Sequence, residues 1–195
     1  MRKWITGVGT GETFSCTSLF LGREEWFMEL WDVYDENRVA TGKTHVRGVP
    51  LGTGEYHLVS DIWLVNGNQE ILLTKRHPDK PYGLMWECSG GSVLAGETSI
   101  EGALRELSEE VGIRAVKEQL RLIHAIRLKE RFVDTYITRQ NVTIKDITIQ
   151  QEEVVDAKFV TFEQLLEMWK QGIVVPKSRF LLYKDKIREF IQPSS

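Results

Sequence analysis

Three glutamates recur at helical spacing near the middle of the chain, and they constrain its fold more than any other feature. Glu106, Glu109 and Glu110 stand at positions i, i+3 and i+4, which places their carboxylates on one face of a helix. Like charges this close destabilise a helix by roughly 0.2–0.5 kcal/mol per pair. A divalent cation relieves that repulsion, and Mg²⁺ commonly takes one or two carboxylates together with substrate phosphates. The pattern therefore predicts a helix that holds divalent metal against a diphosphate.

The boundaries of this helix can also be predicted. Thr98 is a favourable N-cap residue and Gly112 a favourable terminator, so we expect the helix to run from about Thr98 to Val111. An aliphatic stripe at helical spacing predicts the face that packs on the core. This stripe consists of Ile100, Leu104, Leu107 and Val111.

Two residues of the helix should shape its acidic face. Gly102 lies one turn before Glu106, so no side chain there would block an approaching phosphate. Arg105 is four residues from both Glu101 and Glu109, and we expect it to pair with one of them and hold the acidic face in order.

The segment around the helix also fits a longer pattern, Gly-x5-Glu-x7-Arg-Glu-aliphatic-x-Glu-Glu-x-Gly-aliphatic, which begins at Gly91 and includes Glu97. It resembles the box of the Nudix hydrolases, and the resemblance extends over roughly residues 55–190. The resemblance implies an α/β (α+β) fold, an α/β/α sandwich with a mixed β-sheet. It also implies a metal-dependent hydrolase that cleaves a diphosphate linkage, in a nucleoside diphosphate derivative or related substrate, by water attack at phosphorus.

The same resemblance implies the metal ligands. Glu106 and Glu110 are the first choices and Glu109 follows, with the backbone carbonyl of Gly90 as an additional ligand. Glu97 is expected to support these ligands at the metal site. Two or three Mg²⁺ or Mn²⁺ ions would bind the phosphates and activate water.

The catalytic base is expected on a later acidic segment. Glu152 and Glu153 precede a strand-like run from Val154 to Val160, where relatives bring a glutamate towards the metals. The alternative for both is a solvated loop. Arg105 joins these glutamates in the predicted catalytic set, together with Glu109 and Glu110.

A second resemblance concerns the residues from His57 to Lys80, which are similar to isopentenyl-diphosphate isomerase. It implies that Arg76 and Lys80 grip a diphosphate, whereas the alternative for both is ordinary surface charge. Four positions depart from the isomerase pattern. Its essential cysteine falls at Gly90, its metal-binding histidines at Ser92 and Pro50, and its glutamate at Arg131. An isomerase and a non-catalytic ligand-binding domain therefore remain as alternatives to the hydrolase.

Composition excludes several classes of protein. The net charge of −3 indicates no basic surface for a nucleic-acid polymer or an anionic membrane. Cys16 and Cys88 are too few for a disulfide framework, and no apolar run approaches the ~18 residues of a membrane span. Without a signal-peptide pattern at its start, the chain is expected in the cytoplasm. The expected partner is a small-molecule diphosphate, and a homodimer is left open.

Residues 1–27 lack a clear period and are expected to form a flexible N-terminal extension, followed by a single domain over residues 28–195. Within that domain, alternation and turn residues predict an order of strands and helices. Strands are expected near 29–34, 38–40, 57–65, 70–76, 86–89, 117–128, 132–139 and 154–160, and further helices at 162–171 and 179–191. Specificity is expected in residues 29–60 and 130–150. Four aromatic residues are candidates for stacking on a base or for ordinary packing, namely Trp31, Tyr34, Tyr82 and Trp86.

Overall fold

The structure, a computed structural model, describes residues 28–175 and 179–192. The predicted extension over residues 1–27 lies outside this part of the chain, as does Cys16. The secondary-structure elements follow the predicted order. They are β1 (Leu30–Tyr34), β2 (Ala40–Val46), β3 (His57–Val65), β4 (Ile71–Arg76), β5 (Trp86–Glu87), β6 (Ser89–Ser92), α1 (Ser99–Val111), β7 (Arg121–Arg127), β8 (Arg131–Arg139), β9 (Val154–Val160), α2 (Phe162–Lys170) and α3 (Phe180–Ile191).

A seven-stranded sheet organises the molecule around β3. This strand pairs in parallel with β8 along its full length, from His57 opposite Arg131 to Val65 opposite Arg139. The other pairings in the sheet are antiparallel, including β3 with β6 and β7 with β8. The sheet is therefore mixed, as predicted.

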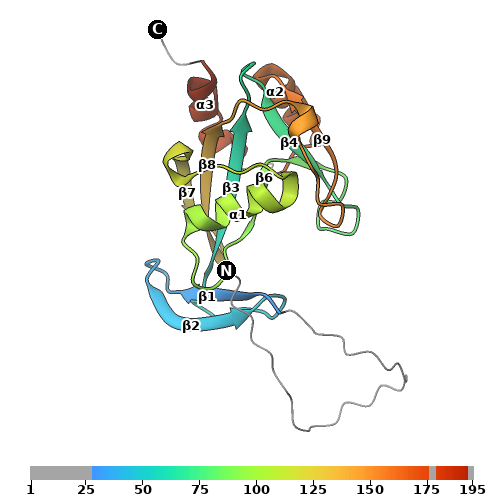
Figure 1. The fold of residues 1–195 in the computed structure, drawn as a ribbon. Helices are drawn as coiled ribbons and strands as arrows, with labels where there is room; N and C mark the ends of the chain where they lie inside the picture. The colour runs from blue at the N-terminus through green and yellow to red at the C-terminus, as the bar shows by residue number, and fades with distance from the viewer. Residues whose placement is uncertain (1–27, 176–178, 193–195) are drawn as a thin grey trace, which may run out of the picture.

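Alternating side chains of β3 build two separate cores, because successive residues of a strand point to opposite faces. Ile62 and Leu64 pack with the buried face of α1, whereas Trp63 and Val65 pack with residues of α2 and α3. Cys88 is buried in the second core. Helices thus cover both faces of the sheet, with α1 in front of β3 in Figure 1, and the predicted α/β/α sandwich is confirmed.

The ends of α1 lie where the sequence predicts them. Thr98 forms a capping box with Glu101, and Gly112 ends the helix in the left-handed conformation with φ 75°. The role predicted for Gly102 is wrong. A Cβ at that position would lie 2.9 Å from Cγ2 of Val93 and 3.3 Å from Oγ of Ser60. Gly102 therefore allows α1 to pack closely on β3 and on Val93, which follows β6, and it leaves no passage for a phosphate.

Three predicted boundaries differ from the structure. Arg38 has φ 64° and belongs to the turn before β2, which begins at Ala40. The expected strand over residues 86–89 divides at Cys88, and its second part continues to Ser92 as β6. The strand expected over residues 117–128 begins only at Arg121, because Lys117–Gln119 form a short 3-10 helix before β7. No helix in the described part of the chain is long and apolar enough to cross a membrane.

The β1–β2 hairpin forms a second, two-stranded sheet below the main one in Figure 1. Its turn residue Arg38 forms a bidentate ion pair with Asp134 of β8, with Nη1 donating to Oδ1 at 2.8 Å. The amide of Ala95, in the loop before α1, donates to the carbonyl of Leu30 at 2.8 Å. The hairpin is therefore fixed both to the sheet and to the loop that leads into α1.

Replacing Arg38 with alanine should destabilise the protein, because Asp134 is only 3% exposed and would lose its partner. Removing one partner of a buried pair costs about 3–5 kcal/mol, and we expect about 2–3 kcal/mol here since Arg38 is partly exposed. Urea unfolding measures the loss. Lys43→Ala is the matched control on the same hairpin, because Lys43 and Glu55 form an exposed pair that contributes less than about 1 kcal/mol. Equal losses for the two variants would contradict the anchoring role.

Candidate functional site

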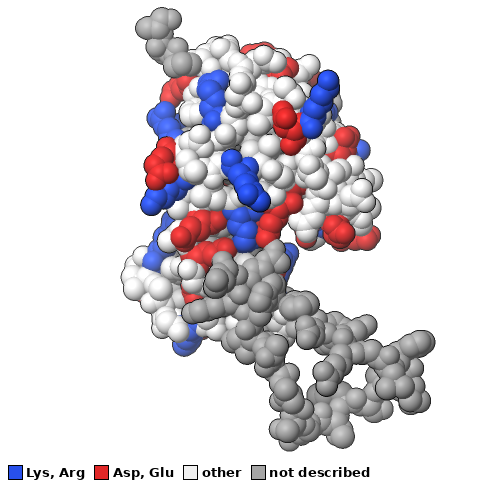
Figure 2. All heavy atoms as spheres, viewed as in Figure 1, with Lys and Arg blue, Asp and Glu red and all other residues white. Residues whose placement is uncertain are grey.

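A cleft of about 700 Å³ lies where α1, β3, β6 and the β1–β2 hairpin meet. His57, Val59 and Asp61, which alternate along β3, line it together with Gly90 and Ser92 of β6. Acidic and basic side chains gather in the middle of the face shown in Figure 2, above the hairpin. The volume lies within the range of small-molecule sites, roughly 300–1,000 Å³.

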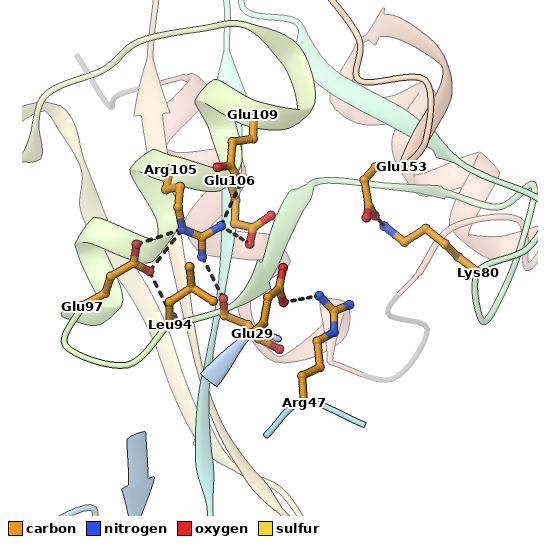
Figure 3. A network of polar contacts seen from close by, with 10 residues as sticks. Glu29, Arg47, Lys80, Leu94, Glu97, Arg105, Glu106, Glu109 and Glu153 are labelled. Carbon is orange, nitrogen blue, oxygen red and sulfur yellow. Dashed lines mark hydrogen bonds and ion pairs between the residues drawn. The ribbon is translucent and has the colours of Figure 1, made fainter. Parts of the chain in front are cut away.

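Arg105 organises the acidic face of α1 (Figure 3). Its Nη1 donates to Glu106 at 2.8 Å and to Glu109 at 3.0 Å, and its Nε donates to Glu97 at 2.9 Å. Its Nη2 donates to the carbonyl of Ser92 in β6 at 2.9 Å. One guanidinium therefore joins the helix, the loop before it and the neighbouring strand.

The hydrogen-bond partners of Glu97 and Glu101 bear on two predictions, the supporting role of Glu97 and the pairing of Arg105 with Glu101. Glu97 accepts from Arg105 and from the amide of Leu94, and it is not among the residues that line the cleft. This position fits a supporting role, in which Glu97 holds Arg105. The alternative pairing of Arg105 with Glu101 is wrong, because the Glu101 carboxylate accepts from the amide and hydroxyl of Thr98.

Glu106 and Glu110 point from α1 into the cleft beside β6. A Cβ at Gly91 would lie 2.5 Å from Oε1 of Glu106, so the glycine leaves room for this carboxylate. Glu110 is 2% exposed, and its Oε2 has no hydrogen-bond partner in the described part of the chain. Burial raises the pKa of Glu110 well above its ordinary value, and repulsion from Glu106 and Glu87 adds to this.

These residues fit a divalent cation. No three acidic, histidine or cysteine side chains within residues 28–175 and 179–192 converge closely enough to hold a metal by themselves. Mg²⁺ does not require them, since one or two carboxylates commonly suffice when substrate phosphates supply further ligands. The unpartnered oxygen of Glu110 is such a ligand, and a cation would remove the cost of burying its charge. The carbonyl of Gly90 remains a predicted ligand.

Arg76 and Lys80, the predicted phosphate-binding residues, both line the cleft. Arg76 lies 2.5 Å from Glu87, and both side chains are largely buried. Lys80 pairs with Glu153, which also lines the cleft. Each cation is thus placed where a phosphate could reach it and is already paired with a carboxylate.

The structure distinguishes the two glutamates predicted as the base. Glu153 lines the cleft, whereas Glu152 is exposed and does not. The solvated-loop alternative therefore describes the position of Glu152, and Glu153 is the one in reach of the site.

Asp61 and Arg179 belong to the cleft but were not predicted. They form an ion pair with Nη1 3.0 Å from Oδ2, and their side chains are 14% exposed or less. Burial raises the pKa of Asp61, although Arg179 counteracts this. An acidic residue within a mostly apolar strand is a signal that could have identified Asp61, because buried carboxylates require a partner.

The four candidate aromatic residues have different positions. Trp31 stacks on His57 with ring centroids 4.0 Å apart and an interplanar angle of 11°, and Tyr82 is exposed at the cleft. Trp86 packs in the core and Tyr34 against a smaller cluster.

Burial, with a contribution from a nearby arginine, lowers the pKa of His57 to about 4, so His57 is neutral near pH 7.

Comparison with known proteins identifies the family. The NUDIX domain profile matches residues 55–180. The chain belongs to the Nudix family. It is 41% identical over 151 residues to an uncharacterized Nudix hydrolase, lmo0368, of Listeria monocytogenes, and the match covers 76% of this chain and 89% of that one.

Two further proteins show more limited similarity. Dihydroneopterin triphosphate diphosphatase of Escherichia coli is 40% identical over 62 residues, which are 32% of this chain and 39% of that protein. The fold resembles the crystal structure of DR0079 from Deinococcus radiodurans with a TM-score of 0.64 and 21% identity, over 83% of this chain and 98% of that one. The predicted family is confirmed, and the chain is an enzyme of the Nudix pyrophosphohydrolase class.

Gly91→Ala should lower turnover by about 100-fold, because a new methyl group would displace the Glu106 carboxylate and a shift of about 1 Å can cost that much. The melting temperature should change little, because the atom that must move is the far end of a side chain. Gly52→Ala is the matched control, since its Cβ would meet the carboxylate of Glu55 at 2.8 Å, away from the cleft. Turnover that falls equally in both variants would contradict the role of Gly91.

Proposed function

We propose that this Nudix enzyme uses Mg²⁺ or Mn²⁺ to hydrolyse a diphosphate linkage in a nucleoside diphosphate derivative or a related small molecule. The observation that supports this most directly is the unpartnered, buried carboxylate oxygen of Glu110 beside Glu106 in the cleft. The name of one relative, a diphosphatase of dihydroneopterin triphosphate, supports the same class of substrate.

In this proposal Glu106 and Glu110 hold the cation, with Glu109 and the carbonyl of Gly90 as further ligands. The bound cation would neutralise phosphate charge and lower the pKa of an attacking water. Arg105 keeps the glutamates in position through its contacts with Glu106 and Glu109. Preorganised charges of this kind lower the barrier because they need not reorient during the reaction.

Glu153, Lys80 and Arg76 form the opposite side of the proposed site. Glu153 accepts the proton of the attacking water, and Lys80 and Arg76 bind phosphate oxygens. Lys80 must then exchange its ion pair with Glu153 for a phosphate, which would release the Glu153 carboxylate to act as a base. We also propose that the protein acts in the cytoplasm.

The isomerase alternative receives no support from the cleft. Proton addition and removal on a carbon skeleton needs an acid and a base on opposite sides of the substrate. Gly90 and Arg131 both line the cleft, where the isomerase pattern requires a cysteine and a glutamate. Glycine has no side chain to supply, and a guanidinium stays protonated near neutral pH.

Glu110→Gln should lower turnover by about 100-fold or more, as expected when charge stabilisation at the reacting phosphate is lost. We expect millimolar Mg²⁺ to raise the melting temperature of the wild type. The Glu110→Gln variant should lose this increase. A ligand that binds only the folded protein stabilises it by about 2.7 kcal/mol when its concentration is 100 times its Kd.

The assay for this prediction is phosphate release from a panel of diphosphates with a coupled phosphatase. Thermal melts with and without metal give the second measurement. Glu101→Gln is the matched control on the same helix, because glutamine also serves in a capping box. Normal turnover and a normal response to Mg²⁺ in the Glu110 variant would exclude it as a ligand.

Incubation with isopentenyl diphosphate should yield no dimethylallyl diphosphate, because the cleft lacks the acid and base that isomerisation needs. Slow release of phosphate is compatible with the proposal. Chromatography of the products measures both. Metal-dependent formation of dimethylallyl diphosphate, together with no hydrolysis of any panel compound, would favour the isomerase.

A further inference from the structure

The β1–β2 hairpin precedes the matched NUDIX domain, which begins at residue 55, yet its side chains line the cleft. Glu29, Trp31 and Arg47 come from the two ends of this hairpin. The anchoring of the hairpin to β8 and to the loop before α1 fixes their position. The cleft is therefore completed by residues outside the family domain.

Arg47 is the cation among these three residues. Its Nη1 donates to Oε2 of Glu29 at 2.5 Å, and its backbone amide donates to the Glu29 carbonyl at 2.9 Å. The Arg47 side chain is 53% exposed. Within the described part of the chain, its Nη2 and Nε donate to no other residue. The guanidinium thus keeps donors that face the open cleft.

The surrounding charges show that Arg47 is close to the proposed metal site. Burial opposes its charge, but the hydrogen bond to Glu29 and the fields of Glu153 and Glu106 outweigh this and raise the pKa of the guanidinium. Figure 3 shows Arg47 on the side of Glu106 opposite Arg105, facing the Lys80–Glu153 pair. A diphosphate held between these glutamates would therefore lie within reach of Arg47.

We propose that Arg47 is a substrate-binding residue, which donates to the phosphate oxygens of the diphosphate, and that Glu29 positions it. The inference rests on the proposed function, because it takes the diphosphate to bind between Glu106 and Glu153. A guanidinium suits this role, since its planar set of donors matches phosphate oxygens. The Glu29–Arg47 pair is exposed enough to contribute little to stability, so its loss should not disturb the fold.

The test is titration calorimetry of the full chain with methylenediphosphonate, a non-hydrolysable diphosphate, in the presence of Mg²⁺. Arg47→Ala should raise its Kd by about tenfold or more, as expected for losing a hydrogen bond to a charged group. Arg47→Lys keeps the charge but loses the planar donors, and it should give an intermediate Kd. Lys43→Ala should bind like the wild type, because Lys43 lies on the same hairpin but pairs with Glu55 and does not line the cleft.

Kinetics on a panel substrate give an independent measurement. Arg47→Ala should raise KM by about tenfold and change kcat by less than about threefold, the signature of lost binding that is equal in ground and transition states. Circular dichroism and thermal melts establish that each variant is folded. If Arg47→Ala does not fold, the Kd and KM of Arg47→Lys are compared with those of the wild type instead.

Two results would overturn the inference. One is an unchanged Kd and KM in Arg47→Ala, and the other is failure of the wild type to bind methylenediphosphonate with Mg²⁺. A wild type that binds this compound but hydrolyses no panel diphosphate would refute the proposed function alone. The comparison of Kd between wild type and Arg47→Ala would still decide the role of Arg47.

Discussion

The arrangement of the site depends on one guanidinium. Arg105 contacts three carboxylates and the Ser92 carbonyl, and these partners belong to the helix, its preceding loop and the adjacent strand. Arg105 offsets the repulsion between Glu106 and Glu109, which lie three residues apart on α1. The ion pairs also orient the helix against β6, where Gly91 leaves room for the carboxylate of Glu106. Arg105 therefore holds α1 on its neighbours and, in the proposed function, also keeps the glutamates in position.

Other basic side chains of the cleft are paired as well. Three cations that line it each lie against a carboxylate, and most of these side chains are largely buried. These pairs are Arg76–Glu87, Lys80–Glu153 and Arg179–Asp61. Charges removed from water need such partners, because an isolated buried charge costs several kcal/mol, of order 3–5 for a broken pair. In the proposed function, a diphosphate could enter by exchanging places with the carboxylate of such a pair.

Much of this could be predicted from the sequence, since the signals are local. The cap at Thr98, the end at Gly112 and the acidic face of α1 depend on residues within one or two turns of each other, and the structure places them as expected. The pairing of Asp61 with Arg179 could not be predicted, because the two residues are far apart in the sequence and meet only through the sheet. Gly102 was misinterpreted for the same reason: its neighbours lie on β3 and on the segment after β6, and no helical pattern reveals them.

The parallel pairing of β3 with β8 has a consequence for the order of folding. His57 and Arg131 are register partners separated by 74 positions (131 − 57), so their contact requires closure of a long loop that includes α1. Contacts of such high sequence separation form slowly compared with a locally capped helix. During synthesis, α1 leaves the ribosome before β8 and before the later cleft residues Glu153 and Arg179. The residues of the acidic helix are therefore made well before the sheet that positions them, and the cleft takes its shape only when β8 and the residues after it have joined β3.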